Sequence, residues 1–273
     1  MTGTGIWSSE LRYGDAAEAA DAAAELESLG YTALWVPDVG GDLFGALDRL
    51  LAATSTITVA TGILNIWRQD AAATDAWWAA QSPASRERTL LGLGVSHGPL
   101  IGDAWAKPLA TMRAYLDALD VPSERLCLAA LGPRMLELAR DRTAGAHPYL
   151  VTPEHTARAR EVLGDGPLLA PEQGVVLETD PDTARDIARK MLTGYAAMPN
   201  YAGNWRRLGF TDDDIASLSD GLVDALVAWG DVDTVAARVA EHRAAGADHV
   251  CIQVIQAPRE PPPREAWRAL AGV

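Results

Sequence analysis

The stretch "DAAEAADAAAELESLGYTALWVPD", Asp15 to Asp38, contains a helix followed by a strand. In its first half the apolar residues recur three and four positions apart, which is the period of an amphipathic helix, and Gly30 is typical of a helix end. Its second half, "YTALWVPD", carries the aromatic, β-branched and aliphatic residues of a buried strand. The rest of the chain repeats this alternation of helix and strand.

Eight segments of the chain have the pattern of buried strands, and helices separate them. They are "GTGIWSS", "YTALWVPD", "TITVATGILNIW", "TLLGLGVSH", "RLCLAALG", "GAHPYLV", "PLLAPEQGVVLE" and "DHVCIQVI". This order predicts an α/β fold, a (β/α)8 TIM barrel, and barrels of about 250 residues are routinely single domains. We expect one domain over residues 1–273, with a helical insertion at about 194–230 between strands seven and eight. A doubly wound open sheet is the alternative, but its glycine fingerprint after the first strand is absent.

Composition and charge exclude several classes of protein. The chain has a net charge of −14, with 37 acidic and 23 basic residues, and we find none of the basic stripes typical of nucleic-acid binders. Its apolar runs are much shorter than the roughly 20 residues of a membrane helix, and its start lacks a signal-peptide pattern. Cys127 and Cys251 lie in apolar runs and are expected to be buried thiols. We therefore expect a cytoplasmic protein without nucleic-acid or membrane partners, and no histidine pair has metal-ligand spacing.

Residues at the ends of the predicted strands are the candidates for a site, because barrel active sites lie at the C-terminal ends of the strands. Trp7, Trp35 and Trp67 end the first three strands, where they could form one aromatic wall for a flat ligand or pack inside the barrel. Ser96 and His97 follow the fourth strand. A histidine titrates near neutrality and can move protons.

The stretch "LGPRMLELA", Leu131 to Ala139, is a turn from strand to helix. Gly132 allows a close backbone approach, and Pro133 suits the first helical position. The free N–H groups of Arg134 and Met135 would then favour an anion such as a phosphate, although a well-formed helix start is the other interpretation.

Three further polar or aromatic residues lie near the ends of strands six and seven. Tyr149 follows the sixth strand and is a candidate for the pocket wall. Glu172 and Gln173 interrupt the apolar seventh strand, where they either line the pocket or belong to a surface turn.

Gly62 stands inside the third strand, in "VATGILNIW", where a residue without a side chain weakens strand packing. In a barrel, this position is where the strand would bulge toward the mouth. Asn65 and Trp67 would then lie beyond it, at the rim.

Several of these motifs together resemble the bacterial luciferase-like oxidoreductases. "ELESLGYTALWVPD", "TVATGILNIW", "LLGLGVSHGPL", "LAALGPRMLELA" and "AGAHPYLVTPEHT" follow the order of that family, and the resemblance extends from about Thr4 to Gln253. It is closest to the subgroup that uses the deazaflavin coenzyme F420, with FMN as the alternative cofactor.

The resemblance implies a cofactor ring at the mouth of the barrel, backed by a cis peptide bond between Gly62 and Ile63. It implies a site for the ribityl chain and phosphate at the end of strand four and at the turn after strand five. The residues expected to bind the cofactor are Trp35, Gly62, Ile63, Asn65, Ser96, His97, Gly132, Pro133, Arg134 and Met135. The residues expected to line the substrate pocket are Trp7, Trp67, Tyr149 and Gln173.

The chain departs from the family in the loop after strand two. Many members carry a histidine there, in a "PDH" pattern, whereas this chain has Val39 in "PDVGGD". His97 and Glu172 are therefore the candidates for a catalytic proton-transfer group, and a reaction that needs no proton donor is the alternative.

The resulting prediction is an F420-dependent oxidoreductase that transfers a hydride between the deazaflavin and a small organic substrate. An FMN-dependent monooxygenase is the first alternative and would usually need a partner reductase. A non-catalytic flavin-binding barrel is the second. The family commonly forms homodimers, and the adjacent Trp77 and Trp78 suggest an interface, because neighbours on a helix point about 100° apart.

Overall fold

The computed structural model describes residues 1–102, 105, 107–256 and 260–273. In this part of the chain, every paired strand runs parallel to its neighbours. The strands are β1 (Gly3–Trp7), β2 (Ala33–Val36), β3 (Thr58–Thr61), β4 (Leu64–Asn65), β5 (Thr89–Gly94), β6 (Leu126–Leu128), β7 (Gly145–Ala146), β8 (Leu168–Leu169), β9 (Glu172–Val176), β10 (Val227–Trp229) and β11 (His249–Val254).

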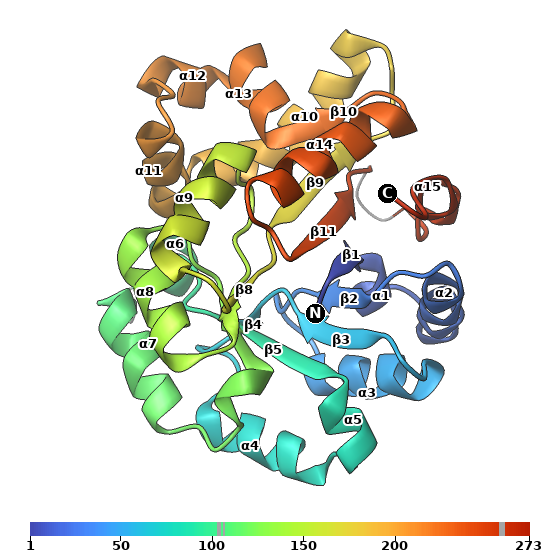
Figure 1. Cartoon of the computed structure of the whole chain (residues 1–273), viewed down its shortest axis with the longest axis vertical. Coiled ribbons are helices and arrows are strands. Elements are labelled where there is room, and N and C mark those ends of the chain that lie inside the picture. Colours follow the sequence, from blue (N-terminus) through green and yellow to red (C-terminus); the bar gives the residue numbers. More distant parts are fainter. Residues whose placement is uncertain (103–104, 106, 257–259) are drawn as a thin grey trace.

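The helices alternate with these strands and lie around the sheet (Figure 1). They are α1 (Glu10–Tyr13), α2 (Ala16–Ser28), α3 (Leu43–Ala53), α4 (Ala71–Ala80), α5 (Pro83–Glu87), α6 (Gly98–Ile101), α7 (Pro108–Asp117), η2 (Ser123–Arg125), α8 (Pro133–Arg142), α9 (Pro153–Leu163), α10 (Pro181–Ala196), α11 (Pro199–Arg207), α12 (Asp212–Ser217), α13 (Asp220–Leu226), α14 (Val232–Ala244) and α15 (Arg264–Ala269).

The sheet curls into a barrel in the order β9-β11-β1-β2-β3-β5-β6-β7-β8. The segment that carries β8 and β9 closes it, because Ala170 N donates to Ala146 O of β7 at 2.9 Å and Cys251 N of β11 donates to Pro171 O at 2.9 Å. β3 with β4, and β8 with β9, are the two halves of predicted strands three and seven. The predicted (β/α)8 barrel is confirmed.

The segment expected to be a helical insertion differs from the prediction in one element. The short strand β10 lies within it and pairs with β9, with Val227 opposite Gly174. Three apolar residues directly after a helix give no periodic signal, which is why the strand was not predicted. The helices α11, α12 and α13 gather at one end of the molecule (Figure 1).

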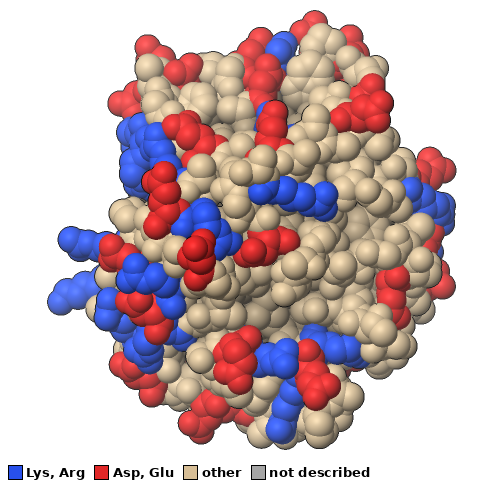
Figure 2. Space-filling view, viewed as in Figure 1, with Lys and Arg blue, Asp and Glu red and all other residues tan. Residues whose placement is uncertain are grey.

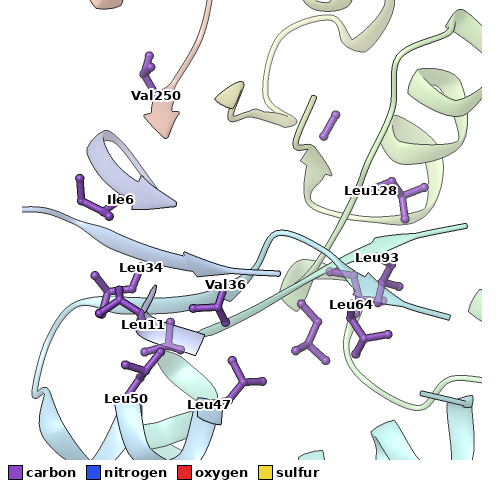
Figure 3. Packing of buried hydrophobic residues seen from close by; sticks show 14 of the residues in the cluster. Ile6, Leu11, Leu34, Val36, Leu47, Leu50, Leu64, Leu93, Leu128 and Val250 are labelled. Carbon is purple, nitrogen blue, oxygen red and sulfur yellow. The ribbon is translucent and has the colours of Figure 1, made fainter. Parts of the chain in front are cut away.

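Side chains of the barrel strands alternate between the helices and the lumen. Leu34 and Val36 of β2 lie on the same side as Leu47 and Leu50 of α3, in a layer between sheet and helices (Figure 3). The lumen holds a separate cluster of Trp7, Ala33, Trp35, Ala60, Leu90, Cys127, Ala170 and Cys251. Both cysteines are free and buried, as expected, and burial raises the pKa of each thiol.

The interface suggested by the tryptophan pair of α4 is not supported. Trp77 and Trp78 are both buried. Trp77 stacks on Phe44 and donates its Nε1–H to Asp48 Oδ1 at 2.9 Å, while Arg86 lies over the ring of Trp78. The two rings point in different directions, but neighbouring helices and side chains cover both of them. Neither tryptophan ring is therefore free to contact a partner subunit.

One face of the molecule carries mixed charges of both signs. On the face drawn in Figure 2, lysine and arginine side chains stand among acidic ones without forming a continuous basic stripe. Among the described residues, no helix is both long and apolar enough to span a membrane.

Candidate functional site

A cavity of about 1030 Å³ opens at the C-terminal ends of the strands. Small-molecule sites commonly measure about 300–1,000 Å³, so this one can hold a cofactor together with a small substrate. Residues after six strands and from helices α10 and α11 surround it. The predicted site residues that line it are Trp7, Gly62, Ile63, Asn65, Ser96, His97, Gly132, Met135 and Tyr149.

One wall of the cavity is the backbone at Gly62 and Ile63. The peptide bond between them is cis, as expected. Trp7 donates its Nε1–H to Gly62 O at 2.7 Å, and Asp38 N donates to Ile63 O at 3.2 Å. A Cβ on Gly62 would lie 2.6 Å from Nε1 of Trp7 and 3.1 Å from Nε2 of His147. Glycine is therefore needed here, because neighbouring rings occupy the space that a side chain would take.

Asp38 places a buried carboxyl beside this wall. Its Oδ2 accepts a hydrogen bond from Asn65 N at 3.3 Å, while Oδ1 has no partner among the described residues. Burial raises the pKa of Asp38, and the positive charges of Arg12 and Arg68 oppose that shift. Asp38 is the one carboxylate among the described residues of the lining.

His97 lies at the cavity wall beyond β5, after Ser96, whose φ is +57°. Nδ1 of His97 lies 2.9 Å from Oδ1 of Asn200. An amide oxygen only accepts, so Nδ1 carries the hydrogen and Nε2 is left to accept. Burial lowers the pKa of His97, which favours the neutral ring. At neutral pH this side chain is therefore suited to accept a proton.

The N-terminus of α8 opens toward the cavity. Its N-cap, Gly132, offers no side-chain oxygen to the free N–H groups. A Cβ at Gly132 would lie 3.9 Å from the guanidinium of Arg207. The guanidinium of Arg207 donates to Leu131 O at 3.3 Å and to Asn204 Oδ1 at 3.1 Å. It forms no ion pair within the described part of the chain. A helix N-terminus beside an unpaired arginine suits an anion.

The structure does not assemble the aromatic wall predicted from three tryptophans. Of the three, only Trp7 lines the cavity. Trp35 lies inside the barrel with its ring stacked on His147, and its Nε1–H donates to His249 Nε2 at 3.2 Å. Trp67 turns aside, because its Nε1–H donates to Val95 O at 2.8 Å. The wall prediction was wrong for Trp35 and Trp67, since tertiary hydrogen bonds direct both rings elsewhere.

Neither polar residue of the seventh strand lines the cavity. Glu172 is buried with Oε2 accepting from Leu150 N at 3.0 Å, and burial raises its pKa to about 8. Gln173 donates to Gly174 O and to Leu226 O, and its Oε1 lies 3.0 Å from His242 Nε2. Consecutive strand residues point to opposite faces, so Gln173 faces the helices while Glu172 lies inward beneath the cavity floor.

The turn at the start of α8 contributes only some of the cofactor-binding residues predicted there. Gly132 and Met135 line the cavity, whereas Pro133 lines a separate groove of about 210 Å³ and Arg134 is exposed. The first helical turn rotates the side chains of Pro133 and Arg134 away from the mouth. An anion here would be held by the backbone and Arg207.

Sequence reasoning missed the part of the lining that comes from the helices between β9 and β10. Tyr195 and Tyr201 form an aromatic cluster with Tyr149, whose hydroxyl donates to Gln253 Oε1 at 2.7 Å. The segment "YAAMPNYAGNW" has an unusual density of aromatic residues, and that density was the available signal. Nothing local in the sequence shows that these helices fold over the mouth.

Two exposed apolar side chains lie at the entrance of the cavity. Val39, at the position of the expected loop histidine, is 72% exposed, and Leu100 is 64% exposed. The described residues contain no group of acidic, histidine or cysteine side chains that could hold a metal ion.

Comparison with known proteins agrees with this architecture. The family described as luciferase-like monooxygenase matches residues 1–121. The predicted resemblance to luciferase-like oxidoreductases is thus confirmed for the N-terminal part of the sequence.

Solved structures of the same fold cover the whole chain. An F420-dependent secondary alcohol dehydrogenase, solved with an F420-acetone adduct, has a TM-score of 0.73 at 16% identity, covering 100% of this chain and 98% of its own. The F420-dependent tetrahydromethanopterin reductase of Methanopyrus kandleri has a TM-score of 0.69 at 17% identity. The match covers 99% of this chain and 97% of the reductase. A third structure is the oxygenating constituent of 3,6-diketocamphane monooxygenase from Pseudomonas putida, in complex with FMN. Its TM-score is 0.66 at 16% identity, and the match covers 100% of this chain and 98% of the monooxygenase. At this level of identity, the similarity establishes the fold.

Proposed function

We propose that this luciferase-like oxidoreductase binds coenzyme F420 and transfers a hydride between the deazaflavin and a small organic substrate. The observation that carries the proposal is a single cavity that joins the Gly62–Ile63 wall to the N-terminus of α8 and Arg207. A flat ring with a phosphate-bearing chain needs both features in one continuous space. The residues present therefore fit a flavin or deazaflavin nucleotide.

A second groove supports F420 over FMN. It measures about 210 Å³, lies between α8, α9 and α11, and shares Leu131 and Arg207 with the main cavity. Arg158 also lines it. Its guanidinium pairs with Glu154 and donates to Arg207 O at 2.7 Å, so the groove brings a second guanidinium near Arg207. FMN ends at its phosphate, whereas F420 continues beyond its phosphate into an anionic tail. Two solved structures of the same fold, with TM-scores of 0.73 and 0.69, are F420-dependent enzymes and add support.

The bound deazaflavin would supply two-electron hydride chemistry. The protein would position the cofactor and substrate, exclude water and transfer a proton. Trp7 and the tyrosine cluster around Tyr149 would exclude water from the reacting face. His97 Nε2 would accept the proton of a substrate hydroxyl in the oxidising direction and return it in the reducing direction. Asp38 is the second group that could exchange a proton with the substrate, because its carboxyl lines the cavity and burial raises its pKa. Glu172 lies beneath the floor and would act only through other residues.

The entrance favours a small substrate with apolar surface. Val39 and Leu100 expose aliphatic side chains there, and an aliphatic entrance does not favour a highly charged substrate. The substrate class that fits is a small alcohol or carbonyl compound with an apolar body.

An FMN-dependent monooxygenase is the second candidate. The family that matches residues 1–121 is described as luciferase-like monooxygenase, and one solved structure of this fold contains FMN. That function would need a flavin-reducing partner. A barrel that binds the cofactor without turnover is the third candidate, motivated by Val39 at the position of the loop histidine.

Equilibrium binding decides between these candidates. The purified chain is titrated with F420, with FMN and with the deazaflavin riboside that lacks phosphate and tail, and the quenching of ligand fluorescence is followed. We expect micromolar affinity for F420 and at least tenfold weaker binding of the other two. Micromolar binding of FMN without binding of F420 would instead support the monooxygenase.

Turnover with the loaded protein tests the catalytic assignment. Reduced F420 is mixed with a panel of small aldehydes and ketones, and oxidation of the cofactor is followed by absorbance. His97→Asn should lower kcat about 10²-fold or more, the usual contribution of a general acid or base, with little change in the Kd for F420. Binding of F420 without turnover of any substrate would instead support the non-catalytic cofactor-binding barrel.

A further inference from the structure

One amide side chain of the cavity lining has a fixed orientation and an unused donor. Gln253 lies in β11, two residues after Cys251 of the lumen cluster. Alternate residues of a strand point to the same side, so Gln253 also points inward, one step nearer the mouth. It lines the cavity and is partly exposed. A ligand in the cavity can therefore reach its polar end.

Tyrosine hydroxyls set the orientation of this amide. Tyr149 donates its O–H to Oε1 of Gln253 at 2.7 Å. The hydroxyl of Tyr195 lies 3.3 Å from the same tyrosine oxygen, which accepts there because its own hydrogen is already used. The ring of Tyr149 also packs against Trp7 and Tyr201. Oε1 is thus held at the aromatic wall, and Nε2 is the free end of the amide.

Nε2 of Gln253 is a donor that the protein leaves accessible. It has no hydrogen-bond partner among the described residues, and it is not one of their fully enclosed polar atoms. It therefore keeps surface that faces the cavity. An amide nitrogen carries two hydrogens and accepts none, so the atom that fits beside it is an acceptor oxygen.

The place of Gln253 in the barrel separates it from the expected cofactor contacts. The wall at Gly62 and Ile63 follows β3, and α8 follows β6. At least two strands of the barrel lie between β11 and either of these strands. Three strands, β1, β2 and β3, separate β11 from β5, which His97 follows. A cofactor held by the wall and by α8 leaves the side at β11 to the substrate.

We infer that Nε2 of Gln253 donates a hydrogen bond to an acceptor oxygen of the substrate, an inference that rests on the proposed function. His97 exchanges its proton with a different oxygen, because it lies on another side of the mouth. The substrate class thereby narrows to a small apolar molecule with two oxygen functions, such as a diketone or a hydroxyketone. Gln253 determines specificity, since it favours an acceptor oxygen over an apolar group of the same shape.

The test compares two probes of the same shape. Acetophenone carries a carbonyl oxygen where α-methylstyrene carries a methylene group. Their dissociation constants are measured by ligand-observed NMR on the protein loaded with oxidised F420, which has no hydride to transfer. Gln253→Met keeps the length of the side chain but has no donor. In this variant the preference for acetophenone over α-methylstyrene should fall about fivefold or more, the usual size of one hydrogen bond.

A matched variant controls for the substitution itself. Gln256 also follows the inward part of β11, but its Nε2 donates to Pro261 O at 2.8 Å and it does not line the cavity. Gln256→Met should therefore keep the preference of the unaltered chain. A second measurement needs no variant: infrared spectra of isotope-labelled acetophenone bound to the unaltered chain. The carbonyl stretch should lie below its value in hexane, because an accepted hydrogen bond weakens the C=O bond.

The outcomes separate this inference from the proposed function. An unchanged preference in Gln253→Met, no measurable binding of acetophenone, or a carbonyl stretch at its hexane value would overturn the role of Gln253 and leave the proposed function standing. A tenfold loss of F420 affinity in Gln253→Met would do the same, because it would assign the amide to the cofactor. Failure of the unaltered chain to bind F420 would overturn both.

Discussion

Gly62 shows how one residue acts on both the fold and the site. Its missing side chain leaves room for Trp7 and His147, and its carbonyl oxygen accepts the hydrogen bond from Trp7. The strand pattern around Gly62 indicated a position that needs a glycine. It did not indicate which side chains occupy the space, because those come from β1 and from the segment after β7, distant in the sequence.

Replacement of Gly62 by alanine should therefore destabilise the protein. The new Cβ would lie 2.6 Å from Nε1 of Trp7, so the indole must shift, and overpacking of this kind costs about 1–3 kcal/mol. Urea unfolding should show the loss, together with weaker cofactor binding. The control is Gly221→Ala in α13, where nothing lies within 4 Å of the added methyl group. An equal effect of both substitutions would contradict the packing argument.

At the scale of the element, α8 combines a sequence signal with a tertiary one. The Gly-Pro turn predicted a helix start with free N–H groups, and α8 begins at Pro133. The arginine beside that start comes from α11, more than 70 residues later. Its guanidinium reaches Leu131 O only because α11 packs beside the turn.

Arg207→Gln should weaken binding of phosphate-bearing cofactors specifically. Hydrogen bonds to charged groups contribute about 1.5–3 kcal/mol, so the affinity for FMN or 5-deaza-FMN should fall about tenfold or more, with little change for the matching riboside. Titration of each pair of ligands measures the difference. Arg206→Gln is the matched control, because Arg206 is exposed and pairs with Asp212. An equal loss for the riboside would place the phosphate elsewhere.

For the molecule as a whole, four buried histidines make stability depend on pH. Burial lowers the pKa of His147 and His155 to about 4 and of His242 and His249 to about 3. Their ordinary pKa is 6.5, so below that pH the unfolded chain takes up protons that the folded chain excludes. The raised pKa of Glu172, about 8, acts in the opposite direction, because the folded state retains a proton that the unfolded chain loses above pH 4.5.

The net result is about three protons taken up on unfolding near pH 5.5. The free energy of unfolding should therefore fall by about 4 kcal/mol per pH unit as the pH drops through this region. Urea titrations at closely spaced pH values between 5 and 7 measure the slope. His242→Gln removes one of these histidines, so about one proton fewer is taken up on unfolding. The slope should then fall by about 1.4 kcal/mol per pH unit. A free energy of unfolding that stays constant over this range would contradict the assignment.

The homodimer remains a prediction that rests on the family resemblance alone. The pair Trp77 and Trp78 no longer supports it, since both rings pack within one chain. The argument from helix geometry was correct about their directions. It failed because α3 and Arg86 cover the two sides, which a helical wheel cannot show.

The sequence by itself determined the barrel, the position of the mouth, the glycine of the third strand and the helix start at the Gly-Pro turn. Each of these follows from local periodicity, turn chemistry or the order of the motifs. Only the tertiary structure decided which side chains enter the cavity. Trp35 points away from the cavity and hydrogen-bonds His249, and Gln173 likewise hydrogen-bonds His242. Arg207 of α11 instead reaches the start of α8 and lines the cavity. A side chain's direction at a strand end depends on partners distant in the chain, and local pattern carries no information about them.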